Sequence, residues 1–525
     1  MRRWSVTLVT SWASKIGVLG FIMKKILAIL LAAGALAAAE KPKLVLAIAV
    51  DQFRYDYLLR FRSEYKEGLA SLLTRGAVFT NARYEHFPTV TAIGHSTLLT
   101  GATPSISGIV GNDWFDREAG KVVTSVSDAA TSLLGGSGTG ASPRKLLVST
   151  LGDELKMSNG NQSRVIGISL KDRSAILPAG HMADGAYWFD GKTGNFISST
   201  FYFKELPAWA RDFNAARPAD RYKGAVWMNR KYPDAGEKLY GALPDSPYGN
   251  ELIEAFAESA IRGEQLGSRG VTDVLTVSFS SNDYVGHALG PDAPEVREMS
   301  ILTDRVIGKL FQFLDARLGM KNVVVVMTAD HGVSPVPEVN QARRMPGGRM
   351  PPGIVKETVQ AALARKYGAG NWIANPDEHS LYLNVDLIRE KKLDRVAVDQ
   401  AAAEAALTIP HVFRAYTREQ LMNGFAMEDQ VGRRVMNGFY IRRSADIFVM
   451  LEPYWMFTAH GTTHGTTFSY DSHVPVIFMG PGIKAGRFHE PIAVNDIAPT
   501  LATLFGVETP SGSVGRVLAE IFAAE

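Results

Sequence analysis

Acidic and histidine side chains follow several short apolar runs, and they are the residues of this sequence best suited to chemistry. The run KLVLAIAVDQ carries Asp51 near its end, and NVVVVMTADHG is closed by Asp330 and His331. The run VLTVSFSSNDYVGH contains Asp283 and His287 as a D-x3-H pair. A single aspartate after a strand is more often a turn former than a ligand. Three acids and two imidazoles in such positions favour a metal centre instead.

His464, in the stretch HGTTHGTT, completes a set of three carboxylates and three neutral imidazoles. The set divides into two groups of three ligands, which leaves open coordination positions on each metal, as a catalytic zinc site needs. Three carboxylates contribute −3 against +4 from two dications, so the surplus positive charge would attract phosphate and stabilise an alkoxide. His460 is the alternative ligand to His464, whereas His473 is expected to be structural. Histidine with carboxylate suits zinc and also permits manganese or cobalt.

The stretch FPTVTAIGHSTLLTG (residues 87–101) offers hydroxyl groups but no cysteine or carboxylate. A threonine hydroxyl is a poor nucleophile near neutral pH, yet coordination to a dication lowers its pKa, as zinc lowers that of bound water from about 16 to about 7. No His/Asp pair is then required to activate it. TAIGHSTLLT predicts the start of a helix, which would put Thr91 where free backbone N–H groups favour an anionic phosphoryl group. Thr89 is the rival nucleophile, and we expect His95 to pack within the helix.

The apolar runs themselves are rich in β-branched residues and are typical of buried strands in a mostly parallel sheet. They cover residues 43–50, 274–279, 322–328 and 474–482. Between them, residues 295–318 carry apolar side chains at helical spacing. This alternation predicts an α/β fold with a central, mostly parallel β-sheet flanked by helices on both faces. In such sheets ligands bind beyond the carboxyl ends of the strands, where the acids described above would lie.

Two regions lack this alternation. Residues 185–249 are rich in aromatic residues, proline and glycine, and residues 341–439 carry mixed elements of their own. We expect both to be insertions over the sheet of a single catalytic domain spanning residues 40–525, rather than separate domains. Loops of this kind often shape access to a substrate.

The order of these residues along the chain resembles that of the alkaline phosphatase superfamily, from about Lys43 to Phe505. The resemblance is closest to the type I phosphodiesterase/nucleotide pyrophosphatase branch and its single-chain bacterial alkaline phosphatases. The residues that carry it are Asp51, Thr91, Asn112, Asp283, His287, Asp330, His331 and His464. It implies an alkaline-phosphatase-like fold, two bound Zn²⁺ ions and phosphate esters as substrates.

The resemblance also assigns roles to single residues. It implies one zinc held by Asp283, His287 and His464, and a second held by Asp51, Asp330 and His331, towards which the nucleophile bridges. The family pattern P-T-x-T-x-x-(N/G)-H selects Thr91 over Thr89 as that nucleophile. Asn112 in GIVGNDW follows at the family's spacing, 112 − 91 = 21, and would donate to a phosphoryl oxygen. His464 is preferred to His460 because it begins the His-Gly pair that precedes the Tyr-Asp and V-P-V-I-F segment.

Lys171 and Arg173, in VIGISLKDRSAILPAGH, bear on the choice between monoester and diester. On an extended segment these two residues would face the same way, near the sheet's active edge. They resemble the Lys-x-Arg pair of the bacterial monoesterases. A monoester dianion presents three non-bridging oxygens, of which arginine can engage two while lysine adds a point charge. A diester has an ester group in place of one charge and would gain less from the pair.

These features predict a zinc-dependent alkaline phosphatase that hydrolyses small-molecule phosphate monoesters of broad range through a phosphothreonine intermediate. A phosphodiesterase or nucleotide pyrophosphatase is the alternative. A non-catalytic periplasmic metal- or phosphate-binding protein is less favoured, because nucleophile, ligands and phosphate contacts are all present. A sulfatase would need a cysteine or an S-x-P-x-R sequence in the nucleophile loop, and the chain has neither.

The N-terminus is typical of a secretory signal peptide. Met23-Lys24-Lys25 is followed by ILAILLAAGALAAA, which predicts cleavage after Ala39 and a periplasmic or extracellular protein. Residues 1–22 fit either an extended n-region or an upstream start, with Met23 as the true one, and the apolar run is too short for a membrane span. Residues 1–39 hold five of the basic residues and no acid, so their removal changes the net charge from +3 to 3 − 5 = −2. That balance argues against a nucleic-acid partner. The absence of cysteine excludes disulfides, and the family resemblance suggests a monomer.

Overall fold

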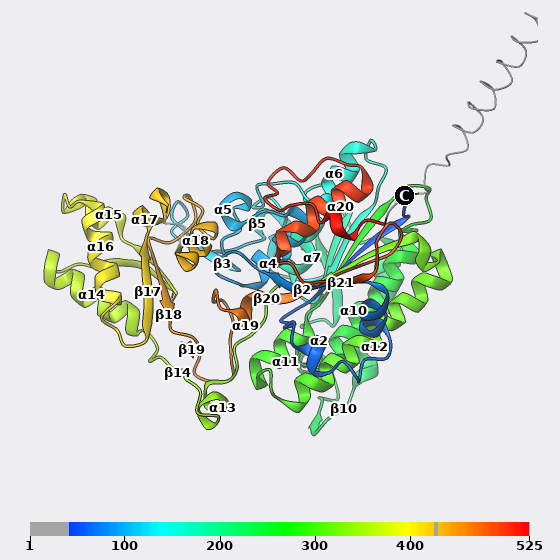
Figure 1. The fold of residues 1–525 in the computed structure, drawn as a ribbon, viewed down its shortest axis with the longest axis horizontal. Helices are drawn as coiled ribbons and strands as arrows, with labels where there is room; N and C mark the ends of the chain where they lie inside the picture. Colours follow the sequence, from blue (N-terminus) through cyan, green and yellow to red (C-terminus); the bar gives the residue numbers. More distant parts are fainter. Residues whose placement is uncertain (1–40, 378, 425–428, 524–525) are drawn as a thin grey trace, which may run out of the picture. The chain divides into compact units, whose positions relative to one another are not determined.

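The computed structural model describes residues 41–377, 379–424 and 429–523 (Figure 1). The predicted signal peptide, residues 1–39, lies outside the described residues. Residues 42–525 form one compact unit.

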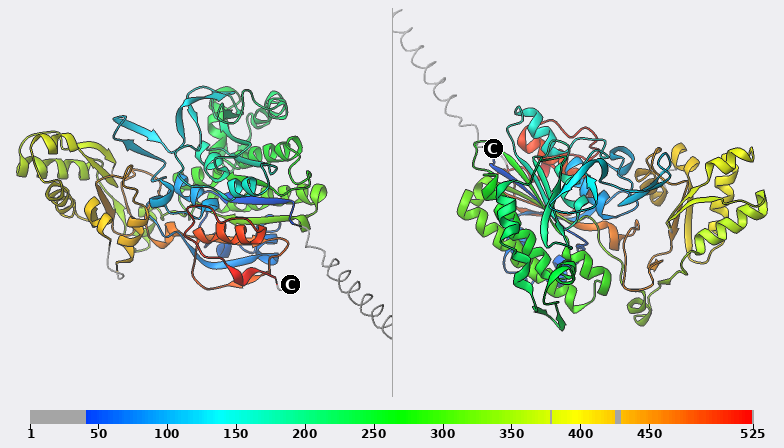
Figure 2. Two further views of the ribbon diagram at one scale, coloured as in Figure 1. Left: turned by 90° about the horizontal axis from the view of Figure 1, so that it is seen from above. Right: turned by 180° about the vertical axis from the view of Figure 1, so that it is seen from behind.

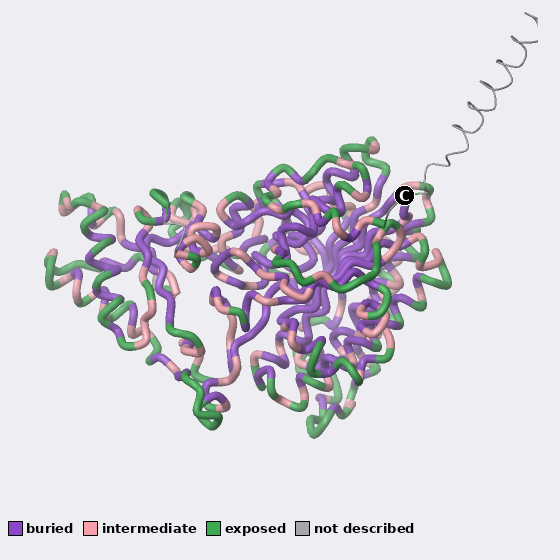
Figure 3. Tube along the Cα trace, in the orientation of Figure 1, coloured by how far each residue is buried: buried purple, intermediate pink, exposed green. Residues whose placement is uncertain are grey.

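A 12-stranded sheet runs through this unit, and its centre is parallel (Figure 1). Five neighbouring strands share one direction: β13 (Val323–Thr328), β1 (Leu44–Val50), β12 (Asp273–Phe279), β7 (Val165–Ser169) and β8 (Gly185–Asp190). Nearly every residue of these strands is buried, as expected for parallel strands covered on both faces. Figure 3 shows this buried layer at the middle of the molecule. The predicted α/β fold is confirmed.

Antiparallel strands extend the sheet at both edges. On one side β20 (His473–Met479) pairs antiparallel with β13 and with β2 (Ala77–Arg83), which also pairs with β21 (Gly486–Phe488) and β22 (Ile492–Ala493). On the other side β9 (Asn195–Ser199), β5 (Ser127–Leu134) and β6 (Thr139–Ala141) follow β8. Strands β8 and β9 belong to the region 185–249, so the beginning of that region is part of the sheet and not a cover over it.

Helices pack on both faces of the sheet (Figures 1 and 2). One layer contains α3 (Gly68–Arg75), α10 (Pro247–Gly263) and α12 (Pro294–Leu318). The other contains α4 (Thr91–Thr100), α6 (Leu151–Ser158), α7 (Asp172–Ala179) and α20 (Ile497–Phe505). The helix predicted over residues 295–318 is α12. Among the described residues, no helix is both long enough and apolar enough to cross a bilayer.

A second, smaller sheet lies in the chain between β13 and β20. Its strands, in the order β15 (Ile373–Asp377), β16 (Ser380–Leu383), β18 (Ile447–Leu451) and β17 (Val412–Thr417), are all antiparallel. They pack on α14 (Ile354–Tyr367) and α16 (Arg395–Ala406) around a separate apolar core that includes Trp372. We call residues 348–456 the inserted segment, because β14 (Gly348–Arg349) and β19 (Trp455–Met456) pair at its two ends. Its sheet uses β18, which lies beyond the boundary expected at residue 439.

Shorter elements connect these layers. They are α2 (Tyr57–Arg60), α5 (Pro104–Ser107), β3 (Asp113–Asp116), β4 (Lys121–Thr124), α8 (Ala208–Ala215), β10 (Val226–Trp227), β11 (Arg230–Lys231), α9 (Gly236–Ala242), α11 (Ser281–Leu289), α13 (Pro337–Ala342), α15 (Val385–Glu390), α17 (Arg418–Asn423), α18 (Gln430–Asn437) and α19 (Ser469–Ser472). Among them, α11 begins directly after the central strand β12 and carries Asp283 and His287.

Candidate metal and phosphate site

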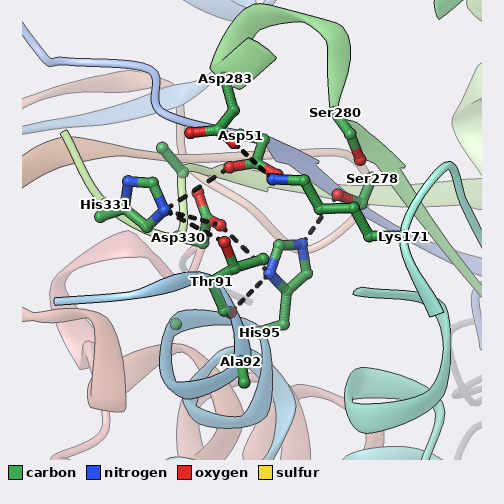
Figure 4. A network of polar contacts seen from close by, with 12 residues as sticks. Asp51, Thr91, Ala92, His95, Lys171, Ser278, Ser280, Asp283, Asp330 and His331 are labelled. Carbon is green, nitrogen blue, oxygen red and sulfur yellow. Dashed lines mark hydrogen bonds and ion pairs between the residues drawn. The ribbon is translucent and has the colours of Figure 1, made fainter. Parts of the chain in front are cut away.

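Four of the predicted ligands lie just beyond the carboxyl ends of neighbouring parallel strands. Asp51 follows β1, Asp330 and His331 follow β13, and Asp283 lies in the first turn of α11, after β12. Because β1 lies between β12 and β13, the three strand ends bring these side chains together (Figure 4). All four residues are almost fully buried.

The predicted ligands form two overlapping groups. The ligand atoms of Asp51, Asp330 and His331 lie within 4.8 Å of one another, and so do those of Asp283, His331 and His464. The first group has the members expected for one zinc. In the second group His331 takes the place expected for His287, whose Nε2 nevertheless lies 3.2 Å from Asp283 Oδ1. The structure therefore gathers all six residues, with His331 shared between the groups.

The three histidines are oriented in the same way. Each donates its Nδ1–H to a backbone carbonyl: His287 to Thr462 at 2.9 Å, His331 to Gly332 at 3.0 Å and His464 to Thr89 at 2.8 Å. Their Nε2 atoms face the carboxylates. This arrangement, in which the second ring nitrogen is fixed by a backbone acceptor, is the usual setting of a metal-binding histidine. His460 is exposed, and His473 contacts the Thr80 carbonyl instead.

Unpartnered buried oxygens also fit a bound cation. Asp51 Oδ1 and Asp330 Oδ2 are buried and make no hydrogen bond. A buried carboxylate oxygen without a partner is costly, and a metal ion would satisfy it. Burial and the neighbouring Asp330 raise the pKa of Asp51 well above its ordinary value. The residues present therefore suit a divalent cation both in ligand type and in excess negative charge.

Thr91 is the first residue of α4, as predicted, and its side chain reaches the ligand groups. Its Oγ1 lies 3.5 Å from His331 Nε2 (Figure 4). The helix comes this close because Gly94 packs on the Asp330 backbone, where a Cβ would lie 2.2 Å from the Asp330 carbonyl oxygen. Thr89, the rival nucleophile, donates its hydroxyl to the Thr466 carbonyl at 2.8 Å. Its hydroxyl thus holds the loop and is turned to the backbone.

His95 packs within α4, as expected, and also contacts the ligand set. Its Nδ1–H donates to the Thr91 carbonyl at 2.9 Å and lies 3.3 Å from Asp330 Oδ2. Its Nε2 lies 2.8 Å from the Ser278 hydroxyl on β12. The ring therefore ties the start of α4 to two of the central strands.

Asn112 is held at the start of the same helix. Its Oδ1 accepts a hydrogen bond from the Ala92 N–H at 2.9 Å. That contact fixes the amide so that its NH₂ group remains to donate in another direction. The placement suits a donor to an oxygen of a group bound next to Thr91.

Lys171 and Arg173 lie at this edge of the sheet, but the prediction that they share an extended segment is wrong. β7 ends at Ser169, Lys171 is the N-cap of α7, and Arg173 lies in its first turn. Asp172 favours a helix start at this point because its charge suits the N-terminal end of the helix dipole. The two cations therefore lie at the start of one helix rather than on one face of a strand.

The ammonium group of Lys171 lies within the carboxylate cluster. Its Nζ is 2.6 Å from Asp51 Oδ2 and 2.6 Å from Asp283 Oδ2. Burial opposes the charge, but the two carboxylates prevail and raise the pKa of Lys171. Conversely, burial would raise the pKa of Asp283, yet Lys171 and His287 hold it well below its ordinary value. Lys171 also lies 5.2 Å from the centre of the Tyr284 ring. Arg173 Nε is buried and has no hydrogen-bond partner.

Two residues in contact with this cluster were not predicted from the sequence. Gln52 donates hydrogen bonds to both Asp283 and Asp330, and the ring of Tyr284 lies under the ammonium group of Lys171. Each directly adjoins a predicted ligand in the sequence, and that adjacency is the only signal that marked them.

A cavity of about 240 Å³ opens beside Asn112 and His464. Its far wall belongs to the inserted segment and includes His379, Tyr382 and Phe448. The lining combines apolar side chains, among them Phe87, Trp114 and Phe448, with polar ones that include Asp113, Asp377 and His379. A group attached to a phosphate beside Asn112 would therefore extend into a space with both apolar and polar walls.

The chain is similar to several known proteins over most of its length. Residues 45–473 match the family model of the type I phosphodiesterase/nucleotide pyrophosphatase family. The alkaline phosphatase PafA of Elizabethkingia meningoseptica is 36% identical over 95% of this chain and 98% of its own length. The alkaline phosphatase PhoV of Synechococcus elongatus is 36% identical over 92% of this chain and 93% of its own. The crystal structure of PafA superimposes with a TM-score of 0.86 and covers 93% of this chain and 100% of that one.

Proposed function

The chain belongs to the type I phosphodiesterase/nucleotide pyrophosphatase family, and we propose that it is an alkaline phosphatase that hydrolyses phosphate monoesters through attack by Thr91. One observation carries this proposal. The Thr91 hydroxyl lies against His331, which belongs to both ligand groups, with Lys171 in the same cluster. A nucleophile, two cation sites and a phosphate-binding lysine thus meet at one point.

The cations in this proposal are two Zn²⁺ ions. One group would be Asp51, Asp330 and His331; the other would be Asp283 and His464 with His287. When bound, the ions would lower the pKa of the threonine hydroxyl and stabilise the negative charge that develops during transfer. The apolar strands beneath the site keep the carboxylates away from bulk water, which strengthens these interactions.

The chain's own residues carry the remaining steps. The Thr91 oxygen attacks phosphorus in line and forms a P–O bond as the bond to the ester oxygen breaks, giving a phosphothreonine and a free alcohol. Asn112, Lys171 and Arg173 hold the non-bridging oxygens during this transfer. Thr91 is the first residue of α4, where the positive end of the helix dipole favours an anionic group. A water molecule then attacks phosphorus, releases inorganic phosphate and restores the threonine hydroxyl.

Lys171 and Arg173 make the monoester the favoured substrate. A monoester dianion offers three non-bridging oxygens, so both cations can engage it. In a diester one of those positions is an ester oxygen that carries another organic group. The two cations would then gain less, and the second organic group would need room beside them.

The organic part of the ester would lie in the cavity between Asn112 and the inserted segment. Because its walls combine apolar and polar side chains and no single group dominates them, the cavity suits leaving groups of more than one kind. We further propose that the protein is exported by its N-terminal signal and acts as a monomer on small phosphate esters.

The decisive experiment measures an aryl phosphate and an aryl phosphodiester side by side. Replacing Lys171 or Arg173 by Met should lower kcat/KM for the monoester by about 10²-fold, since one charge-assisted contact to the transferring group is lost. The loss for the diester should be about tenfold smaller. Equal losses for both substrates would refute the assignment of the pair.

Lys156 supplies a matched control. It is also buried and also bound to a carboxylate, Asp184, at 2.7 Å, but it lies outside the site. Lys156→Met should therefore reduce stability without changing the ratio of monoester to diester hydrolysis.

A further inference from the structure

Gln52, the residue after Asp51, has an unusual backbone conformation. Its φ is +60°, in the left-handed region, and only 2% of the residue is exposed. Residues other than glycine, asparagine and aspartate rarely adopt this backbone conformation. Such residues gather at functional sites, where the surrounding structure holds them in place. A turn that served only to reverse the chain would favour glycine here.

The contacts of Gln52 account for a glutamine at this position. Its backbone N–H donates to Asp330 Oδ1 at 3.1 Å, and its side-chain Nε2 donates to Asp283 Oδ1 at 2.7 Å. Asp330 and Asp283 belong to different ligand groups. One residue therefore binds a carboxylate of each group.

These bonds also orient the two carboxylates. With Asp330 Oδ1 held by the backbone of Gln52, Oδ2 lies 3.3 Å from His331 Nε2 and has no hydrogen bond of its own. At Asp283 the amide binds Oδ1, the same oxygen that lies 3.2 Å from His287 Nε2, while Oδ2 accepts from Lys171. The neutral amide adds no charge to a site that already contains three carboxylates.

Gly286 on α11 leaves the space that the amide occupies. A Cβ at this position would lie 1.8 Å from Gln52 Oε1, too close for any side chain. Gly286 stands between Asp283 and His287 on the helix that carries both. The glycine is thus matched to the glutamine, which suggests that the pair acts as one unit.

We propose that Gln52, seated against Gly286, is a positioning residue that fixes the distance and orientation of the two ligand groups relative to each other. The inference rests on the proposed binding of metal ions by those groups. It predicts that removing the amide weakens metal binding without weakening the metal-free fold.

The variant Gln52→Gly separates these two effects. Glycine accepts φ +60° without strain, so the melting temperature of the metal-free protein should stay the same or rise. Its affinity for Zn²⁺, measured by chelator competition, should fall by about 10- to 100-fold, the usual effect of losing a partner of a ligand. The absorption bands of the Co²⁺-loaded protein should shift, because the ligand geometry changes.

Gln52→Met is the companion variant. It keeps the side-chain length and the backbone contact with Asp330 but loses the amide donor. It should weaken Zn²⁺ binding and shift the Co²⁺ bands as Gln52→Gly does.

A double substitution tests the pairing with Gly286. Gly286→Ala alone should displace the amide and weaken Zn²⁺ binding. In the Gln52→Gly background the added methyl group has room, so the double variant should bind Zn²⁺ no worse than Gln52→Gly alone.

Unchanged Zn²⁺ affinity in Gln52→Gly would overturn the inference, as would strictly additive losses in the double variant. A parallel loss of metal-free stability with unaltered Co²⁺ bands would also overturn it, since that marks a purely structural residue. Failure of the unsubstituted protein to bind Zn²⁺ would instead overturn the proposed function.

Discussion

His86, immediately before the nucleophile loop, should make the protein sensitive to acid. The residue is fully buried, and neither ring nitrogen has a hydrogen-bond partner. Its ring centre lies 5.0 Å from that of Tyr84, whose hydroxyl donates to the Ala329 carbonyl beside Asp330. Burial, together with the positive charge of Arg434, lowers the pKa of His86 from 6.5 to about 3. The folded protein therefore keeps this imidazole neutral.

The size of the effect follows from this pKa difference. Between about pH 3 and pH 6.5 the unfolded chain binds a proton at His86 and the folded chain does not, so the free energy of unfolding falls as the pH falls. Each pH unit costs about 1.4 kcal/mol. From pH 7.5 to pH 5.0 the loss from this one residue is about 2 kcal/mol. Above about pH 7.5 the contribution is constant.

The variant His86→Leu isolates this contribution. Leucine has a similar volume and no unpartnered nitrogen, so the fold should tolerate it. Urea unfolding of the variant and the unsubstituted protein, followed by tryptophan fluorescence, should give free energies of unfolding that diverge by about 2 kcal/mol between pH 7.5 and pH 5.0. The variant should be the less acid-sensitive protein.

Parallel curves for His86→Leu and the unsubstituted protein would refute the reasoning. They would show that His86 is protonated to the same extent in the folded and unfolded states. The difference between two matched proteins is the relevant quantity, because the other titrating groups of the site are common to both.

Three further predictions concern the site. Thr91→Ala should lower monoester turnover by about 10³-fold or more with its Zn²⁺ content unchanged, whereas Thr89→Val should lower turnover by about tenfold or less. Steady-state kinetics with metal analysis checks this, and the reverse order of the two losses would make Thr89 the nucleophile. A chelator should abolish activity and lower the melting temperature, because the three buried carboxylates lose the positive charge of the bound ions, and added Zn²⁺ should restore both. Full activity in metal-depleted protein would contradict the metal assignment. Phe448→Ala should raise KM for an aryl phosphate by about tenfold and leave KM for a small alkyl phosphate nearly unchanged, since an apolar side chain is removed from the wall of the cavity. Equal changes in KM for the two substrates would place the leaving group elsewhere.

The strands and the helix that position the site could be predicted because their side chains repeat at regular spacing. α12 has a clear helical period, and β1, β12 and β13 are uniformly apolar runs closed by polar residues. Such runs do not reveal strand direction, so nothing in the sequence distinguished β20, which is antiparallel, from its parallel neighbours. The end of the inserted segment was missed because β18 joins the smaller sheet from beyond residue 439.

The side chains of the site were harder to predict than its strands. Asp51 and Asp330 could be singled out only because several apolar strands end in acids or histidines, since one aspartate after a strand is more often a turn former. The conformation around Lys171 was not predicted, because the expectation of a continuing strand overlooked the helix start at Asp172. Gln52 belongs to no motif, and its role depends on a positive φ and on an absent side chain at Gly286, more than two hundred residues away. Its position next to Asp51 is the one local signal, and that signal does not reveal the fit to Gly286.

The ligands come from segments that are widely separated along the chain, from Asp51 near the beginning to His464 near the end. During synthesis, the group of Asp51, Asp330 and His331 is complete once residue 331 has been made, whereas the group that contains His464 needs nearly the whole chain. Shorter fragments therefore offer only one group of candidate ligands. A site for two cations would be complete only late in maturation, in whichever compartment the finished chain folds.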